Sequence, residues 1–297
     1  MSTITSLISS GGGGSEINDQ KAIYSTANLI TTESGEVWLK SGVVSTDTTT
    51  YPDATTALTG TTYDSDFSLP QMSAPAGLAF DGTHFHILQN NGYVYKYTLA
   101  GVYVSNLQLP STGSWVTGLT YDGTYFYAGD NTNSIIRRYN SSWVLDTSWS
   151  ISYSGFNAYH LGLAIVNGVL YALRQNDYCY RFVLTSSGGT ANGSFSVAAQ
   201  TGTATGLLAT DGTHLYASNQ HQVMFQYTTT GTYTGVSLAV NNYGSNTQSG
   251  GAVFESNVIY VTDDQSDKVV KWNKTFSLGM TAADTTLANG TRYVRIK

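Results

Sequence analysis

The sequence predicts an all-β fold of the propeller class, and three observations indicate it. The 297 residues include 22 tyrosines but only 11% charged residues, against roughly 25% in an average soluble domain. Tyrosine and threonine favour strands, whereas long helices need Ala, Glu, Lys and Leu. A turn signal and an aromatic position both recur along the chain, at spacings of 41 to 47 residues.

The recurring turn signal is a pair of small or polar residues between two apolar runs. Asp-Gly and Asn-Gly are strong hairpin signals, because both central residues of a type I′ turn need a positive φ. The pairs are Ser34-Gly35, Asp81-Gly82, Asp122-Gly123, Asn167-Gly168, Asp211-Gly212 and Ser256-Asn257, with a last echo at Asn289-Gly290.

The segments that flank these turns also repeat. A short apolar strand precedes each turn ("GLAF", "GLTY", "GLAI", "GLLA", "GAVF"), and a second strand, a polar loop and a third strand follow it. The aromatic residue of the third strand is Tyr97, Tyr139, Phe182, Tyr227 or Trp272. Four antiparallel strands in about 40–50 residues are typical of a propeller blade, and a solenoid of stacked β-coils is the alternative.

The repeats set the expected domain organisation. Five clear units cover 77–110, 118–152, 162–198, 206–240 and 251–280. A divergent sixth unit covers 21–70, beside which the C-terminal strand 291–297 can pair, so that the N- and C-terminal strands close the ring. We therefore expect one propeller domain over 21–297, most simply with six blades, although five or seven fit as well.

Residues 1–20 are expected to form an arm outside the propeller. The stretch "GGGGS" at 11–15 is typical of a flexible linker. Ile4, Leu7 and Ile8 lie at helical spacing, so the arm is a candidate docking segment for a partner. A disordered start fits the same composition.

Charge and cysteine content exclude several classes. A net charge of −6 and a pI near 5.2 argue against a nucleic-acid groove, which needs clustered Lys and Arg. No apolar run approaches the roughly 20 residues of a membrane span, and "MSTITSLISS" lacks the features of a signal peptide. Cys179 is the single cysteine, which excludes an internal disulfide and a thiolate zinc site.

Catalysis is not expected. The expected inner strands carry no carboxylate, and only Glu255 follows "GAVF". Glycosidases need two carboxylates roughly 5–10 Å apart, and the Asp-box motif of sialidases is missing from the sequence. The aspartates of the Asp-Gly pairs are explained by turn geometry.

No metal or cofactor is expected either. His84 and His86 lie on one face of a strand, but no third ligand is evident, and His214 occupies the repeat position of His84. The loops "GDNTNS" (129–134) and "DDQSD" (263–267) are rich in oxygen ligands. Neither matches an EF-hand loop, so solvated loops are the favoured interpretation.

The candidate binding site is one rim of the propeller. Loops between the second and third strands share a face with the connections from each outer strand to the next inner strand, so amides, carboxylates and aromatic rings gather there. Such a mixture binds sugars, whereas the plainer hypothesis is polar turns with aromatics that cap the core. The candidates are Trp115, Asp130, Asn131, Asn133, Phe156, Tyr159, His160, Gln175, Asn176, Asp177, Asn219, Gln220, His221, Tyr243, Asp263, Asp264 and Asp267.

Two resemblances refine these expectations. The units over 70–280 resemble the NHL/YVTN class of β-propellers, which share "G-L-a-x-D-G-t" and an aromatic-rich second strand. The block "GEVWLKSGVVSTDTTTYPDAT" (35–55) resembles a module of tail-fibre and other virion proteins of tailed bacteriophages, in which a "W-L-K/R-x-G" strand runs into "T-x-Y-P-D-A-T". The closing "RYVRIK" is similar to the C-terminal strands of such proteins.

The second resemblance implies a non-enzymatic virion component on the tail fibre, the tail or baseplate, or the head surface. It implies assembly in the host cytoplasm into a symmetric oligomeric particle, contact with other virion proteins through the arm, and attachment to host-surface polysaccharide. The chain lacks the long fibre segment of such proteins. A free-standing adhesin or lectin is the alternative, and a propeller hydrolase or lyase is the weakest hypothesis.

Overall fold

A computed structural model describes residues 29–31, 37–41, 53–152, 161–174, 178–202, 204–219, 223–240, 249–279 and 292–296. The described chain is almost entirely β, as predicted, with one short helix, α2 (Ala198–Thr201). No helix in these ranges has the length and apolar character needed to cross a membrane. The chain divides into two compact units, Met1–Leu58 with Phe276–Lys297, and Thr59–Thr275, whereas the sequence predicted one domain over 21–297.

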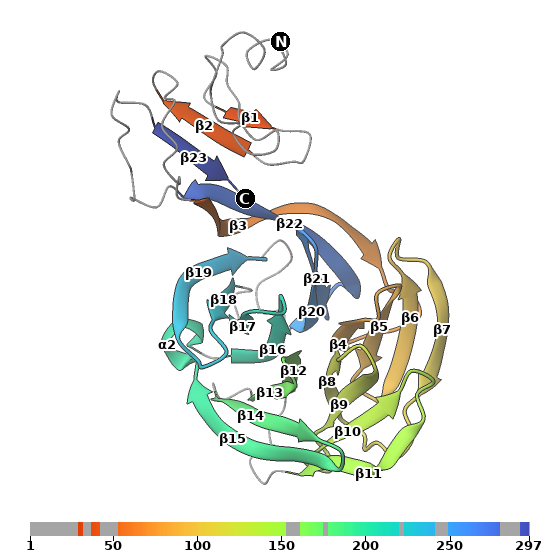
Figure 1. The fold of residues 1–297 in the computed structure, drawn as a ribbon. Coiled ribbons are helices and arrows are strands. Elements are labelled where there is room, and N and C mark those ends of the chain that lie inside the picture. The colour runs from red at the N-terminus through yellow and green to blue at the C-terminus, as the bar shows by residue number, and fades with distance from the viewer. Residues whose placement is uncertain are drawn as a thin grey trace. The chain divides into compact units, whose positions relative to one another are not determined.

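Four consecutive sets of four antiparallel strands form most of the larger unit (Figure 1). Blade 1 comprises β4 (Pro75–Phe80), β5 (His84–Gln89), β6 (Tyr93–Thr98) and β7 (Tyr103–Gln108). Blade 2 comprises β8 (Val116–Tyr121), β9 (Tyr125–Asp130), β10 (Ile135–Asn140) and β11 (Leu145–Ser152). Blade 3 comprises β12 (Leu161–Val166), β13 (Val169–Arg174), β14 (Tyr178–Thr185) and β15 (Gly188–Ser196). Blade 4 comprises β16 (Ala204–Thr210), β17 (Leu215–Asn219), β18 (Val223–Tyr227) and β19 (Tyr233–Ala239).

Blade 5 takes its strands from both ends of the sequence. It comprises β20 (Ser249–Glu255), β21 (Val258–Asp263) and β22 (Lys268–Gly279), and its fourth strand is β3 (Asp53–Ser68). Lys271 Nζ lies 2.8 Å from Asp64 Oδ2, and the rings of Tyr63 and Trp272 meet edge to face at 5.8 Å. The ring is thus closed by N- and C-terminal strands, as predicted, but by β3 and not by residues 291–297.

The innermost strands show how many blades the ring holds. β4 contacts β8, β8 contacts β12, β12 contacts β16, β16 contacts β20, and β20 contacts β4. Among the described strands these contacts close a cycle of five inner strands, and β3 completes blade 5, whereas the sequence favoured six blades and left five or seven open. The inner strands approach closely at glycines: a Cβ added to Gly77 would lie 2.8 Å from the backbone nitrogen of Leu119.

The turns between the first and second strands differ in part from the prediction. Asn167 and Gly168 both have positive φ (50° and 74°), as a type I′ turn requires. At the Asp-Gly pairs only the glycine is positive, for example 91° at Gly82, and the Asp81 N–H bonds to the His84 carbonyl. The aspartate therefore precedes a turn in which glycine is the first central residue, the φ pattern of type II′.

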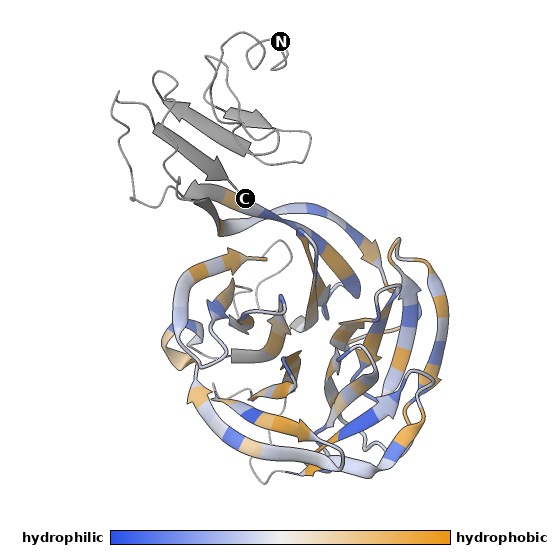
Figure 2. Cartoon of the chain, viewed as in Figure 1, coloured by the Kyte–Doolittle hydropathy of each residue, from blue (hydrophilic) through white to orange (hydrophobic). Residues whose placement is uncertain are grey.

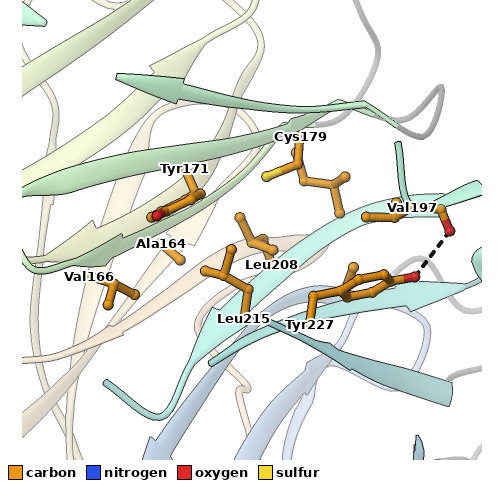
Figure 3. Packing of buried hydrophobic residues seen from close by; sticks show 10 residues of the cluster. Ala164, Val166, Tyr171, Cys179, Val197, Leu208, Leu215 and Tyr227 are labelled. Carbon is orange, nitrogen blue, oxygen red and sulfur yellow. Dashed lines mark hydrogen bonds between the residues drawn. The ribbon is translucent and has the colours of Figure 1, made fainter. Parts of the chain in front are cut away.

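The core lies between the blades. Figure 3 shows the cluster between blades 3 and 4, where Ala164, Tyr171 and Cys179 face Leu208, Leu215 and Tyr227. The Tyr227 hydroxyl donates to the Val197 carbonyl at 3.1 Å. Burial raises the pKa of the Cys179 thiol, which makes it an inert core residue. Along outer strands such as β7, hydrophobic and hydrophilic residues both occur (Figure 2), as expected where one face meets water.

The smaller unit contains β1 (Leu29–Thr31), β2 (Val37–Ser41), β23 (Arg292–Ile296) and the first residues of β3. β2 pairs with β1 and, in register Trp38↔Arg295, with β23, which in turn lies parallel to β3. The C-terminal strand thus pairs beside strands of the 21–70 region, as predicted. Residues 1–20, with Ile4, Leu7 and Ile8, lie outside the described residues.

Candidate functional site

Two segments of the expected rim lie together in the described part of the chain. The Trp115 N–H donates to Thr132 Oγ1 at 3.0 Å, and the Asn131 N–H donates to the Trp115 carbonyl at 2.9 Å. The connection into blade 2 therefore lies against the turn between β9 and β10. Trp115 is 38% exposed at this surface.

The carboxylates of Asp130 and Asp263 on this rim are engaged by neighbouring groups of the protein. Asp130 is buried and accepts hydrogen bonds from the Gly113 N–H, from Asn133 Nδ2 at 2.7 Å and from Arg137 Nε at 3.3 Å. Asp263 is also buried and accepts from the Ser266 hydroxyl at 2.6 Å. These two side chains stabilise the loops, which agrees with the plainer of the two hypotheses for this rim.

The other described candidates also carry structural hydrogen bonds. Asn131 Nδ2 donates to Thr117 Oγ1 at 2.8 Å, and Asn219 Oδ1 accepts from the Val223 N–H at 3.0 Å. Asp267 Oδ1 accepts from the Ala74 N–H at 3.0 Å. Asp264, whose Oδ1 atom is buried, follows Asp263 in the same turn.

The remaining rim candidates fall outside the described residues. They are Phe156, Tyr159, His160, Gln175, Asn176, Asp177, Gln220, His221 and Tyr243. In the described ranges, no group of three or more His, Cys, Asp or Glu side chains is placed to hold a metal ion.

A pocket of about 400 Å³ lies at the axis on the opposite face, between the inner strands of all five blades. Its walls are mainly apolar and backbone surfaces, such as Leu78, Leu119 and Val253. Asp81 and Glu255 are the ionisable carboxylates that line it. The Oδ1 atom of Asp81 already accepts from the backbone N–H groups of Thr83 and His84 at 2.8 and 2.7 Å.

A second pocket, of about 470 Å³, lies between blades 1 and 2 and is called the interblade pocket below. Its polar groups are Asp81, Thr83, His84, His86, Lys96, Ser105 and Ser141, and its apolar walls are Val94, Leu107, Tyr121, Phe126 and Trp143.

The interblade pocket contains a buried imidazole–carboxylate pair. His86 Nε2 lies 2.8 Å from Asp81 Oδ2, and only 3% of His86 is exposed. Burial lowers the pKa of His86, although the Asp81 carboxylate opposes the shift. When the imidazole is neutral and Nε2 carries the proton, His86 donates to Asp81 and its Nδ1 is an acceptor.

This pair resembles two members of a hydrolytic triad, but the third member is not in place. Nδ1 of His86 is buried without a hydrogen-bond partner in the described residues. A nucleophilic hydroxyl would have to lie within hydrogen-bond reach of that nitrogen. In the described residues the pair is therefore an imidazole–carboxylate pair at the pocket with one unpartnered ring nitrogen.

The sequence pattern indicated His86 only as a metal ligand that lacked further partners, and it did not predict the interblade pocket. A usable signal was present: the second strands of blades 2 and 4 carry tyrosine (Tyr127, Tyr216) five residues after the Asp-Gly aspartate, whereas blade 1 carries His86. When one blade replaces a residue that the other blades share, the structure of that blade can differ locally from the others.

The fold and these surfaces define a β-propeller, and comparison with solved structures agrees. The structure is similar to that of glutaminyl cyclase from Myxococcus xanthus, with a TM-score of 0.58 and 15% identity over 76% of this chain and 99% of that chain. Virginiamycin B lyase from Staphylococcus aureus matches with a TM-score of 0.43 and 17% identity, over 82% of this chain and 79% of that one. No protein-family model and no curated protein sequence matches the chain. Likeness at this level of identity concerns the fold alone.

Proposed function

We propose that the protein is a non-enzymatic structural component of a tailed-bacteriophage particle, whose propeller presents a binding surface. The observation that carries the proposal is the pairing of β2 with β23. These strands belong to the two segments that resemble virion proteins, "GEVWLKSG" and "RYVRIK", and Trp38 lies opposite Arg295. Two segments more than 240 residues apart in sequence thus form one small sheet, which supports a shared attachment module.

The propeller itself favours presentation of a surface. The described carboxylates at both ends of blade 2, Asp122 and Asp130, are hydrogen bonded within their turns. The partly exposed Trp115 beside these polar turns suits contact with another protein or with host-surface polysaccharide. In this proposal the smaller unit and the 1–20 arm bind other virion proteins, and the propeller faces outward in a symmetric assembly.

The proposal is tested by the composition of the particle. Gradient-purified virions, analysed by quantitative mass spectrometry, should contain the protein at a fixed copy number relative to the major capsid protein. A protein that is abundant in the infected lysate but absent from purified particles would refute the virion role.

A free-standing adhesin or lectin is the second candidate, favoured by the exposed Trp115. A glycan array of the full chain should then give signals that the Trp115→Ala variant loses. Val144→Ala is the matched control, because Val144 is 60% exposed but lies in the turn between β10 and β11. Equal signals from both variants would remove Trp115 from any glycan site.

A further inference from the structure

The interblade pocket departs from a pattern that the other blades share. On the blade face that meets the next blade, a residue of the second strand lies opposite a long polar residue of the third strand. The pairs are Tyr127↔Arg138 in blade 2, Tyr171↔Arg181 in blade 3, Tyr216↔Gln226 in blade 4 and Tyr260↔Lys271 in blade 5. In blade 1 the pair is His86↔Lys96.

The long polar residues of blades 2, 4 and 5 have partners on the fourth strand of the same blade. Arg138 bonds to Asp146 Oδ2 at 2.5 Å, and Lys271 bonds to Asp64. Gln226 Nε2 bonds to the Tyr216 hydroxyl, and its Oε1 accepts from Thr234 Oγ1 at 2.7 Å. In these three blades, side chains of the same blade therefore provide the hydrogen-bond or ion-pair partners of the long polar residue.

In blade 1 the polar residue of the third strand has no such partner on the fourth strand. Lys96 lies opposite Ser105 and not opposite an acid, and it has no ion pair among the described residues. The imidazole of His86 is shorter than a tyrosine side chain, so the space that a phenol fills in blade 2 becomes part of a pocket. Two residues that line this space carry a polar group without a partner among the described residues: the partly buried Lys96 with its ammonium, and His86 with its buried Nδ1.

The opposite wall is apolar and firmly packed. The Phe126 and Trp143 rings stack at 4.2 Å, and Tyr121 lies 4.4 Å from Phe126 on that ring system. The His86 ring lies 4.6 Å from Phe126 and 5.4 Å from Trp143. The pocket therefore has one cation, one buried acceptor and an aromatic wall in fixed positions.

We propose that the interblade pocket binds an acidic monosaccharide unit, that is, a sugar ring with a carboxylate. Lys96 would hold the carboxylate, and a sugar hydroxyl would donate its hydrogen to His86 Nδ1. Further hydroxyls match Ser105 and Asp81, and the C–H side of the ring packs on Trp143 and Tyr121.

The size and rigidity of the pocket fit this ligand class. Its volume of about 470 Å³ lies within the roughly 300–1,000 Å³ of small-molecule pockets. Because Nδ1 is a buried acceptor, a ligand that lacks a donor would leave it unpaired, which disfavours simple carboxylates. The inference does not depend on whether the protein belongs to a virion.

Calorimetric titration of the full chain tests the proposal, with sodium glucuronate as the probe. Glucose, which lacks the carboxylate, and acetate, which lacks the ring hydroxyls, are the reference ligands. Glucuronate should bind at least about tenfold more tightly than either, since one charge-assisted hydrogen bond is lost with glucose and the Nδ1 contact with acetate.

Two variants and one control assign the binding to the pocket. Lys96→Gln removes the cation, and Ser105→Asp supplies the acid that blades 2 and 5 carry, so both should weaken glucuronate binding about tenfold or more. Lys271→Gln, at the equivalent position of blade 5, should bind like the wild type. Circular dichroism melts establish that each variant is folded.

The proposal is overturned by any of three results. These are no heat of binding for glucuronate at millimolar concentrations, equal affinities for glucuronate and for glucose or acetate, and unchanged affinity in both folded pocket variants. If the protein is absent from the virion, glucuronate binding is still expected. The outcomes of the two proposals can therefore be distinguished.

Discussion

The Tyr216 hydroxyl donates to Asp211 Oδ2 at 2.7 Å, which ties a hairpin turn to the strand that follows it. Asp122 receives the same bond from Tyr127 at 2.7 Å, and Asp81 receives its counterpart from His86 at 2.8 Å. In each case Oδ1 of the aspartate also accepts from the backbone N–H groups two and three residues later. The repeated aspartate thus stabilises the blade by joining the turn to the second strand.

Removal of this aspartate should destabilise the propeller. Asp211→Ala should lower the free energy of unfolding by about 2–3 kcal/mol, because Tyr216 Oη and two backbone N–H groups lose a charged acceptor. Asp211→Asn should cost about half as much, since the amide oxygen can still accept from the backbone. Urea titrations of both variants measure the loss of unfolding free energy, which should be larger for Ala than for Asn. An Ala variant as stable as the wild type would contradict the structural role of Asp211.

The pair of Asp146 with Arg138 predicts a pH dependence of stability. Hydrogen bonds from Ser148 and Arg138 lower the pKa of Asp146 from 3.8 to about 2. A lowered folded-state pKa stabilises the protein fully above the unfolded value of 3.8, and this stabilisation is lost as the pH falls towards 2.

The matching variant is Asp146→Asn. The difference in unfolding free energy between wild type and variant should be largest above pH 3.8 and should shrink on acidification through that window. Urea titrations in a pH series measure it. A difference that stays constant or grows towards low pH would show that Asp146 does not titrate as described.

Close contact between β20 and β4 predicts that Gly251 tolerates no side chain. A Cβ at this position would overlap the Leu78 backbone nitrogen, so Gly251→Ala should cost about 3 kcal/mol. At Gly60 the nearest atom is the Thr275 hydroxyl at 3.2 Å, a movable side chain, so Gly60→Ala should cost under about 1 kcal/mol. Thermal unfolding compares them, and similar losses would argue against direct contact between the first and last inner strands.

Closure of blade 5 by β3 predicts a charge coupling between Asp64 and Lys271. Asp64→Lys should cost about 1 kcal/mol, because two ammonium groups then meet at a half-exposed site. The swap Asp64→Lys with Lys271→Asp should recover most of that loss. A double-mutant cycle measures the coupling free energy between the two positions. Additive effects of the two changes would argue against the position of β3 as the fourth strand of blade 5.

The sequence predicted the repeated units well because each is a local pattern. Tyr97, Tyr139, Phe182, Tyr227 and Trp272 all fall in third strands, as their spacing indicated. The number of blades, in contrast, depends on a pairing between distant parts of the chain. Residues 249–279 supply three strands, and the fourth comes from residues around Asp64, about 200 positions earlier in the chain. Such a pairing has no signal in the adjacent sequence, so the segment 21–70 was assigned a blade of its own.

The candidate sites show the same limit. Asp130 and Asp263 were selected because polar turns meet on one rim, and they are the last residues of β9 and β21, directly before those turns. Their burial depends on which backbone N–H groups surround each carboxylate, which only the folded chain defines. The interblade pocket needed a comparison within the repeat: His86 in place of tyrosine and Ser105 in place of an acid.

A cryo-electron microscopy reconstruction of the phage particle tests the proposed function most directly. The account predicts five-bladed propeller density on the particle surface that fits residues 59–275, with the sheet of β2 and β23 next to another virion protein. A complete map in which every protein density is assigned and none fits this propeller would contradict the account.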